Sequence, residues 1–439
     1  MEADNREVLS PLLSRSDVKK QFEYLEQTVD EAQKRIDYEL AHDADVLKAI
    51  DVVERFLRRK RRVCYGGQAI NSLLPKARKF YDEKYTIPDY DFFTPERDAD
   101  VDEIISDLQK EGFTEVNKKV GIHDGTMKVM VNYIAVADCT FMLPSFFKII
   151  QKRAKVVNGI LYTDPDFLRM LMHLELSRPR GQIERWKKVY ERLTLLNSAY
   201  PIQKCYDEIK VDETVGWRDR EIILDYCIGS KRVLLGPEGI ELLEKKSDTT
   251  IKELLEFGGP VIMLSADAQK DATDLVEILA QGNERIKKSY KIHFEDVQLE
   301  NIYKFVTIKF RNQPIALIYQ GVSCHSYISF KVDDQELRLA SPDLYLNIYY
   351  SAMIFGKKEL AYFQTSLQCL IQKLHKIVDK ARSSPSRLLP AFGLRCSGRE
   401  HTMATLLRQR QERTESEKKK GKEKKEGKKA RKTRRAERK

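Results

Sequence analysis

The first sixty residues place apolar side chains at the spacing of an α-helix. Apolar residues recur every three or four positions at Phe22, Leu25, Val29, Ala32 and Ile36, and again at Leu47, Ile50, Val53 and Leu57. This spacing predicts helix over residues 17–62, with Ser16 or Asp17 as the N-cap.

Five consecutive cations, Arg58 to Arg62, close this helical segment. Cations at a helix C-terminus suit the helix dipole, so the run fits a solvated helix end. It fits equally an edge that faces RNA or phosphate. The pattern leaves both interpretations open.

The pattern then changes to short strands separated by helices. Residues 63–65 read as a strand that leads through Gly66 and Gly67 into a helix, and residues 89–93 alternate polar and apolar as a half-buried strand does. Further elements are expected at 98–111 (helix), 127–131 and 134–138 (strands), and 144–152, 164–176 and 182–196 (helices). The fold class is therefore α+β.

Residues 258–356 repeat this order of elements. Gly258 and Gly259 precede an expected strand at 261–264, a helix at 271–280, strands at 306–310 and 315–319, and a helix around 344–354. A degenerate copy of the first domain explains the repetition, and so does an unrelated α/β domain. Between about residues 200 and 250 the pattern defines no clear boundaries.

The charge separates a folded body from a basic tail. The chain has 439 residues and a net charge of +11, but residues 416–439 carry fourteen Lys or Arg against four Glu, so the body is close to neutral. From about residue 408 apolar residues are scarce, and such a segment is expected to be disordered. A tail of this kind binds nucleic acid through phosphates, acts as a localisation signal, or binds an acidic partner.

Composition also argues against several classes of protein. No run of eighteen apolar residues occurs and the first sixteen residues are polar, so neither a transmembrane helix nor a signal peptide is expected. The seven cysteines form no C-x-x-C pair, so we expect neither a zinc ribbon nor a disulfide framework. We therefore expect the protein to work in a reducing compartment. Cys64 and Cys139 are expected to be small core residues.

One ordered set of residues carries chemistry. Gly66 and Gly67 open a helix, where backbone N–H groups and the helix dipole favour a phosphate. Asp89 and Asp91 point to one face of a strand because strand side chains alternate. Asp138 lies in an otherwise apolar neighbouring strand. Three such carboxylates are a hard-oxygen site able to hold two divalent ions about 3.5–4 Å apart.

The specificity of this signal lies in the order. A Gly-Gly pair or an Asp-x-Asp pair alone is most often a turn or a solvent-facing strand. Asp138 is the informative member, because a carboxylate between Ala137 and Cys139 is costly unless it is paired or bound to a metal. A structural salt bridge is the alternative explanation for Asp138.

The segments V-C-Y-G-G-Q-A-I-N, P-D-Y-D-F-F-T-P and V-A-D-C-T-F resemble the catalytic segments of the poly(A) polymerase catalytic subunits of asfarviruses, mimiviruses and their relatives. They resemble the poxvirus enzyme more remotely. The similarity covers roughly residues 60–360, including Y-T-D-P-D-F-L-R and the stretch from Ile315 to Ile354.

This resemblance implies a domain plan. A helical segment, 1–60, would precede a DNA polymerase β-like nucleotidyltransferase domain, 61–195, with a mixed sheet and flanking helices. A connecting region, 196–255, would lead to a second, degenerate nucleotidyltransferase-like α/β domain, 256–400, and the basic tail, 408–439. Consistent with lost acids, no Asp-x-Asp strand follows Gly258 and Gly259, and we interpret Asp267 and Asp271 as capping or surface carboxylates.

The resemblance also implies a reaction and its site. The reaction would be template-independent addition of AMP, from ATP, to an RNA 3′ end. Asp89, Asp91 and Asp138 would be the catalytic residues and would hold two Mg²⁺ or Mn²⁺ ions. Gly66 and Gly67 would contact the triphosphate, with Asn71 or Ser72 nearby.

Basic residues add weaker expectations. Four basic residues surround a Pro-Arg-Gly turn and a helix start, from which they could reach a triphosphate or an RNA backbone: Arg178, Arg180, Arg185 and Lys188. Solvation of a charged helix accounts for them equally well. Lys128 lies on the strand beside the acids and could face either side. Trp186 is expected to be a core residue, and His123 and His173 are expected to be ordinary surface or core histidines.

Three functions remain to be compared. The first is a poly(A) polymerase, the second a terminal uridylyltransferase or another RNA nucleotidyltransferase, and the third a catalytically inactive RNA-binding subunit. The expected partners are ATP, an RNA 3′ end, and a second copy of the chain or a processivity subunit, with no membrane. The resemblance implies a viral protein of the virion and the host cytoplasm.

Overall fold

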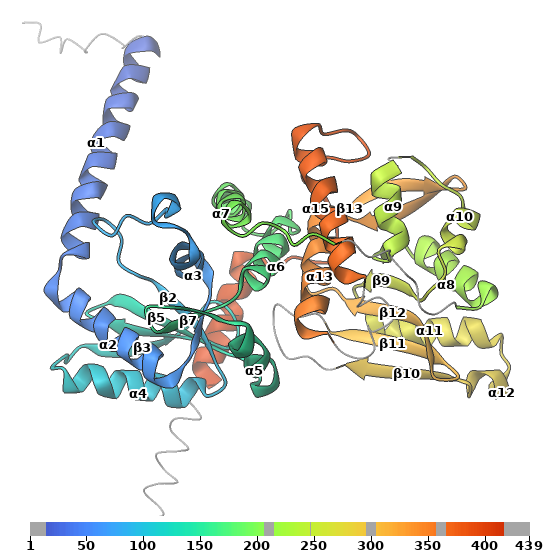
Figure 1. Cartoon of the computed structure of the whole chain (residues 1–439), viewed down its shortest axis with the longest axis horizontal. Helices are drawn as coiled ribbons and strands as arrows, with labels where there is room; N and C mark the ends of the chain where they lie inside the picture. Colours follow the sequence, from blue (N-terminus) through green and yellow to red (C-terminus); the bar gives the residue numbers. More distant parts are fainter. Residues whose placement is uncertain (1–14, 206–214, 246, 296–303, 357–365, 417–439) are drawn as a thin grey trace, which may run out of the picture.

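Two β-sheets, each flanked by helices, form the body of the protein, and a helical segment precedes the first sheet (Figure 1). The computed structural model describes residues 15–205, 215–245, 247–295, 304–356 and 366–416. Both sheets contain parallel and antiparallel strand pairs and are flanked by helices, which confirms the α+β class. The predicted helical N-terminus is also confirmed. Within these residues, no helix combines the length and the apolar character needed to cross a membrane.

The N-terminal helical pattern folds as two helices, α1 (Arg15–Ala41) and α2 (Ala44–Lys60). The break falls at Asp43, which caps α2 by accepting the N–H of Val46 at 2.9 Å. The prediction of one continuous helix is therefore wrong at this point. The predicted N-cap is also wrong, because Ser16 and Asp17 both lie inside α1.

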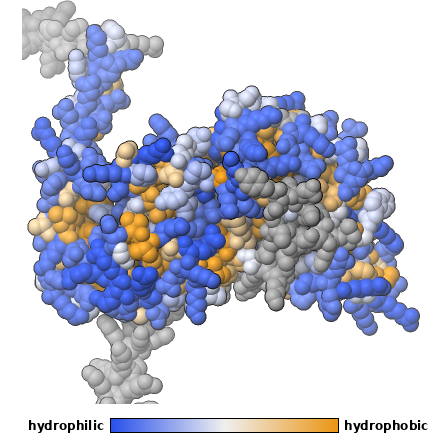
Figure 2. Space-filling view, viewed as in Figure 1, coloured by the Kyte–Doolittle hydropathy of each residue, from blue (hydrophilic) through white to orange (hydrophobic). Residues whose placement is uncertain are grey.

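Helix α1 projects from the body, away from both sheets (Figure 1). Its apolar residues are exposed, namely Phe22, Leu25, Val29 and Ile36. Hydrophilic residues cover most of the rest of the face that Figure 2 shows. The apolar spacing therefore predicted the helix correctly, but the described part of the chain does not bury these apolar side chains.

The cation run at the end of α2 forms ion pairs with α4 (Arg97–Lys110). Arg59 contacts Asp107 at 2.7 Å, and the nearly buried Arg62 contacts Asp100 at 2.7 Å. Lys60 pairs with Glu103 at 2.6 Å. Since these cations are neutralised inside the fold, the structure favours the helix-end interpretation over an RNA-facing edge.

The first sheet has the strand order β3-β4-β5-β2-β1-β7-β6. Its strands are β1 (Val63–Cys64), β2 (Tyr90–Thr94), β3 (Val116–Val120), β4 (Thr126–Val131), β5 (Ile134–Phe141), β6 (Lys155–Val157) and β7 (Ile160–Tyr162). Its other helices are α3 (Gly66–Leu73), α5 (Pro144–Arg153), α6 (Pro165–Leu176) and α7 (Trp186–Ala199). Every predicted element of this region is confirmed, and β3 and the short β6 and β7 are additional.

The second sheet has the order β10-β11-β12-β9-β8-β14-β13-β15. Its strands are β8 (Val233–Leu234), β9 (Val261–Ser265), β10 (Tyr290–Glu295), β11 (Phe305–Phe310), β12 (Gln313–Gln320), β13 (His325–Val332), β14 (Gln335–Ala340) and β15 (Arg395–Ser397). Its helices are α8 (Trp217–Gly229), α9 (Pro237–Lys245), α10 (Ile251–Glu256), α11 (Ala268–Ala280), α12 (Glu284–Lys287), α13 (Pro342–Phe355) and α15 (Leu367–Ser383).

The two sheets share one topology. In each, the central short strand, β1 or β8, pairs antiparallel with the next strand and parallel with a later one, β7 or β14. The backbone bond from Tyr65 N to Asp91 O, 2.9 Å, has its counterpart in the bond from Leu235 N to Ile262 O, 2.7 Å. Gly66 therefore corresponds to Gly236.

This correspondence shifts the predicted repeat. Gly258 and Gly259 stand before β9, the counterpart of β2, and so do not match the Gly66-Gly67 turn. Helix α8, strand β8 and helix α9 lie in the interval 196–255 that was expected to connect the domains, yet β8 is hydrogen-bonded inside the second sheet. The two-residue strand is too short for a periodicity signal.

The two acids interpreted as capping or surface groups differ from each other. Asp267 caps α11 by accepting the N–H of Lys270 at 3.0 Å, as predicted. Asp271 is fully buried, pairs with Arg232 at 2.6 Å and accepts a hydrogen bond from Tyr226 at 2.9 Å. The surface interpretation of Asp271 is wrong, because a cation distant in sequence neutralises it.

Helices α6 and α13 pack against each other and join the two halves of the molecule. His173 is buried between them, with its Nδ1 2.7 Å from Asp343, and Asn347 donates to the carbonyl of Met170 at 2.8 Å. Burial lowers the pKa of His173. Of the two predicted settings, surface or core, the structure shows the core for His173.

The chain returns to the first sheet at its C-terminal end. Residues 403–416 are helical, and Arg410 and Arg413 of this helix donate to the carbonyls of Val120 and Ile122, at 2.9 and 2.8 Å. The prediction of disorder is therefore wrong for residues 408–416, where the hairpin β3–β4 provides the packing surface. Residues 417–439 lie outside the described residues.

Two disulfides link segments that are distant in sequence. Cys205 is bonded to Cys369, and Cys324 to Cys396. The prediction of no disulfides is wrong, because separations of 164 and 72 residues carry no local spacing signal, and the reducing compartment loses its basis. Cys64 and Cys139 are free and buried, as predicted.

Candidate active site at the edge of the first sheet

The diglycine turn joins β1 to α3 with a backbone that only glycine adopts easily. Gly66 has φ +75°, and a Cβ there would lie 2.7 Å from Oδ2 of Asp91. The preceding Tyr65 is extended and donates its N–H to the carbonyl of Asp91 at 2.9 Å. The turn is therefore fixed against β2, with a carboxylate directly beside it.

Two of the three predicted acids lie on adjacent parallel strands, and the third lies just before one of them. Asp91 of β2 stands opposite Asp138 of β5 in the strand register, and Asp89 lies two residues before Asp91. Oδ2 of Asp138 is paired with the ammonium of Lys128, its register partner on β4. Oδ1 of Asp138 is buried and has no hydrogen-bond partner. The structure thus brings the acids together and turns Lys128 toward them.

The electrostatics of the site reflect an excess of negative charge. Burial, followed by the charges of Asp89 and Asp138, raises the pKa of Asp91 to about 8. Desolvation and Asp138 also raise the pKa of Asp89. Lys128 opposes both shifts without cancelling them. Among the described residues, Lys128 is the cation that forms an ion pair with these acids.

The acids alone do not form a closed ligand cage. Among the described residues, no group of three or more His, Cys, Asp or Glu side chains is gathered tightly enough to hold a metal ion as it stands. The ammonium of Lys128 takes one oxygen of Asp138.

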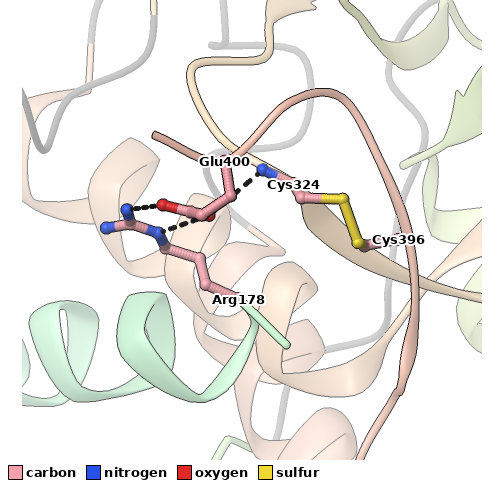
Figure 3. The surroundings of a disulfide bond; sticks show 4 residues. All are labelled: Arg178, Cys324, Cys396 and Glu400. Atoms are coloured by element: carbon pink, nitrogen blue, oxygen red, sulfur yellow. Dashed lines mark hydrogen bonds and ion pairs between the residues drawn. A yellow bond between two sulfur atoms is a disulfide. The ribbon is translucent and has the colours of Figure 1, made fainter. Parts of the chain in front are cut away.

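Two predicted basic residues lie near the acids and one lies elsewhere. The charge of Arg185 acts on Asp91, and that of Lys188 acts on Asp89. Both side chains are exposed at the start of α7. Arg178 instead forms an ion pair with Glu400, which also accepts the N–H of Cys324 beside the disulfide to Cys396 (Figure 3). The structure gives Arg178 a role in joining the second domain.

The polar residues of α3 have internal partners. The side chain of Asn71 is buried and accepts the N–H groups of Phe80 and Tyr81, at 3.0 and 3.1 Å. Ser72 hydrogen-bonds to the side chain of Tyr162. Neither side chain points to a free phosphate-binding position, so the prediction for Asn71 and Ser72 gains no support. Asn71 anchors the loop that follows α3.

One basic residue near the turn was missed. The guanidinium of Arg192 donates to the hydroxyl of Tyr81 at 2.8 Å, and Arg192 lies four residues after Lys188, on the same face of α7. Arg185, Lys188 and Arg192 are spaced for one helix face. This spacing in the sequence could have identified Arg192 as a third cation on the same helix face. Trp186 is partly buried against Phe392, which confirms its packing role.

Comparison with known protein families finds a match in the part of the chain that forms the first sheet. Residues 51–182, with the turn and all three acids, match the family model described as the poly(A) polymerase catalytic subunit. The predicted resemblance is confirmed for this stretch. Helices, strands and acids of the first sheet therefore carry the family's pattern, whereas the second sheet lies beyond the match.

Similar viral proteins support the same reading of this stretch. A candidate poly(A) polymerase catalytic subunit from African swine fever virus is 32% identical over 182 residues, which are 39% of this chain and 36% of that protein. One from Acanthamoeba polyphaga mimivirus is 28% identical over 168 residues, 37% of this chain and 28% of that protein. The chain thus matches only about a third of these relatives' length, 36% of one and 28% of the other.

The fold itself matches over almost the whole chain. The crystal structure of the Megavirus polyadenylate synthase aligns with 96% of this chain and 87% of its own, with a TM-score of 0.77 and 17% identity. The likeness therefore includes the second sheet. At this identity it establishes the shared fold.

Proposed function

We propose that this chain is a template-independent poly(A) polymerase that adds AMP from ATP to RNA 3′ ends by two-metal nucleotidyl transfer. The carrying observation is the pairing of Asp91 with Asp138 in register beside the Gly66 turn. It lies inside the stretch that matches the catalytic subunit family. The first sheet would be a DNA polymerase β-like domain, and the second a degenerate copy.

The residues present fit divalent ions. Oδ1 of Asp138 is buried without a partner, and burial together with the charges of Asp89 and Asp138 raises the pKa of Asp91 to about 8. All candidate ligands are carboxylate oxygens, which suit Mg²⁺ and Mn²⁺. Asp89, Asp91 and Asp138 would hold the ions. Bound there, the ions would lower the pKa of the RNA 3′-hydroxyl and stabilise the leaving pyrophosphate.

The chain's own groups position the reactants. The glycine turn at the start of α3 lets a phosphate approach its N–H groups, and Arg185 and Lys188 add positive charge on the side of α7. Lys128 neutralises Asp138 when no other cation is present. This pair occupies only Oδ2, so Oδ1 of Asp138 would be the oxygen open to an ion.

The alternative functions differ in product or in chemistry. A uridylyltransferase would share the fold and the acids. An inactive RNA-binding subunit would have no use for a carboxylate whose oxygen is buried and unpaired, so Asp138 favours an enzyme. The choice of adenine rests on the resemblance to the viral catalytic subunits.

One assay separates these functions. The purified chain is incubated with an RNA primer, Mg²⁺ or Mn²⁺, and one nucleoside triphosphate at a time. Extension with ATP well above the other three supports a poly(A) polymerase. Preferred extension with UTP selects the uridylyltransferase, and no extension with any nucleotide, together with RNA binding, selects the inactive subunit.

The partners and location belong to the same proposal. RNA and ATP are the substrates, and the exposed apolar residues of α1 offer a surface for a second copy or a processivity subunit. As its relatives are viral, we place the protein in the virion and the host cytoplasm. The basic residues 417–439 would retain RNA. Their deletion should weaken the salt dependence of RNA binding.

A further inference from the structure

Helix α7 presents two cations that have no anionic partner in the described residues. Lys188 and Arg192 are four residues apart, and no carboxylate forms an ion pair with either one in that part of the chain. Repulsion from Arg192 is the main cause of a lowered pKa at Lys188, and Asp89 only partly offsets it. Positive charge is thus gathered beside the acids without being neutralised.

The position of Arg192 is fixed by the loop after α3. Its guanidinium donates to the hydroxyl of Tyr81 at 2.8 Å and stacks over the ring of Phe80, 4.6 Å from the centroid. Asn71 holds both loop residues by accepting their N–H groups. The same helix that begins with the diglycine therefore anchors the loop that holds Arg192.

Arg192 lies directly over the second glycine of the turn. A Cβ on Gly67 would be 2.9 Å from a terminal nitrogen of Arg192 and 2.5 Å from the hydroxyl of Tyr81. A Cβ on Gly66 would meet Asp91 instead. The turn therefore has the acids on one side and an oriented guanidinium on the other.

We propose that Arg192 binds the outer phosphates of the nucleotide triphosphate and that Tyr81 is its positioning residue. This inference rests on the proposed function, because the α-phosphate must lie at the acids. The remaining phosphates then extend past the turn toward Arg192. A guanidinium binds phosphate oxygens in a bidentate manner, and a preorganised one loses little freedom on binding. Gly67 is required here because Arg192 and Tyr81 occupy the space above it.

The test measures nucleotide binding by calorimetry without RNA, so that no reaction occurs. Arg192→Ala should weaken ATP binding roughly 10- to 100-fold, the size expected for losing hydrogen bonds to a charged group. AMP, which lacks the outer phosphates, should bind both proteins equally. Arg192→Lys should recover part of the loss. Lys187→Ala, an exposed neighbour on α7, is the matched control and should change nothing.

A second arm tests the role of Tyr81. Gly67→Ala should weaken ATP binding, and the penalty should shrink in the Tyr81→Phe background, because the hydroxyl nearest the new methyl group is gone. If Gly67 served only the approach of a phosphate to the backbone, the penalty would be equal in both backgrounds. Circular dichroism confirms that each variant is folded.

The outcomes separate this inference from the proposed function. If Arg192→Ala binds ATP as tightly as the wild type, or loses affinity only for RNA, the inference about Arg192 is wrong. The proposed function still holds in that case, provided that the wild type extends RNA. A wild type that binds ATP but adds no nucleotide to RNA overturns the function. An equal loss for ATP and AMP also contradicts the inference, since it would place Arg192 at the nucleoside or the α-phosphate.

Discussion

The two sheets of this protein share one strand order, apart from the additional edge strand β15 of the second sheet, but differ in the side chains at the site's positions. In the first sheet, Asp89, Asp91 and Asp138 converge beside a glycine turn. The strand registers place Pro260, Ile262 and Leu317 at the corresponding positions of the second sheet. There the carboxylates are replaced by apolar or ring side chains, and all five residues of β9 are buried.

This difference shows what the acids cost. The second sheet uses the site's positions for packing, so its core is continuous with helix α13. The first sheet keeps repelling carboxylates at the same positions, with a pKa near 8 at Asp91. The proposed catalytic role accounts for three carboxylates at positions that the second sheet fills with packing residues.

The largest expected effect separates the sheets by activity. Asp91→Asn or Asp138→Asn should reduce AMP incorporation into RNA on the order of 1000-fold, because each removes a charged ligand at the reacting centre. Asp267→Asn, which changes the exposed cap of α11 in the second sheet, should leave the rate unchanged. Primer extension under single-turnover conditions measures both. Normal extension by Asp91→Asn would refute the site.

The next effect concerns stability in the second sheet. Ile262→Asp puts a carboxylate at the position corresponding to Asp91, where the side chain is only 1% exposed and has no cationic register partner. Burying this charge should cost about 3–5 kcal/mol in the free energy of unfolding. Ile262→Val, the control, should cost about 1 kcal/mol. Urea denaturation gives both values. Equal costs would mean that the second sheet accommodates acids as the first does.

A smaller effect should come from the disulfide of the second domain. Cys324→Ser with Cys396→Ser opens a 72-residue loop and should lower stability by about 2–4 kcal/mol. The ATP-dependent extension rate should fall far less than in Asp91→Asn, because the bond lies at β13 and β15. Thermal unfolding with and without reductant tests this. If reductant does not change the melting temperature of the wild type, the disulfide does not contribute to its stability.

The smallest effect is a pH dependence specific to the first sheet. Folded Asp91 keeps its proton up to about pH 8, whereas an unfolded Asp loses it near 3.8. The folded state therefore binds the extra proton between these values, so stability falls as pH rises from about 4 to 8. Asp91→Asn removes this loss. Its advantage over the wild type should grow to on the order of 1–2 kcal/mol at pH 8, once solvent screening is allowed for.

Calorimetry of the chelator-treated proteins at pH 5, 6.5 and 8 measures that advantage. Asp267→Asn again provides the control and should differ from the wild type by the same amount at every pH. A pH-independent advantage for Asp91→Asn would show that Asp91 titrates normally.

The sequence predicted the site's backbone better than its side chains. Alternation put Asp89 and Asp91 on one face, and an acid in an apolar strand identified Asp138. The pairing of Asp138 with Lys128 could not be predicted, because strand pairing decides which face Lys128 takes. Arg178 lay close in sequence to Arg185, yet Glu400, 222 residues away, determines its contact.

The fold followed the same division. Most of the longer helices and strands of the first sheet gave periodic signals and were found. In the second half several elements of similar length, such as α8, β13 and α15, were not predicted. Strand β8, with two residues, gave none, so the repeat was aligned one strand too late. The disulfides and the helix at 403–416 depend on contacts between distant segments, which local patterns do not encode.

The most direct test of the central claim is the binding of Mn²⁺ to the metal-free protein at pH 7, followed by calorimetry in buffers of different ionisation enthalpy. We expect the wild type to bind Mn²⁺ and to release close to one proton, since Asp91 must lose its proton to become a ligand. The Asp91→Asn, Asp138→Asn double variant should bind at least about tenfold more weakly and release none. Equal Mn²⁺ affinity in the two proteins would contradict the account.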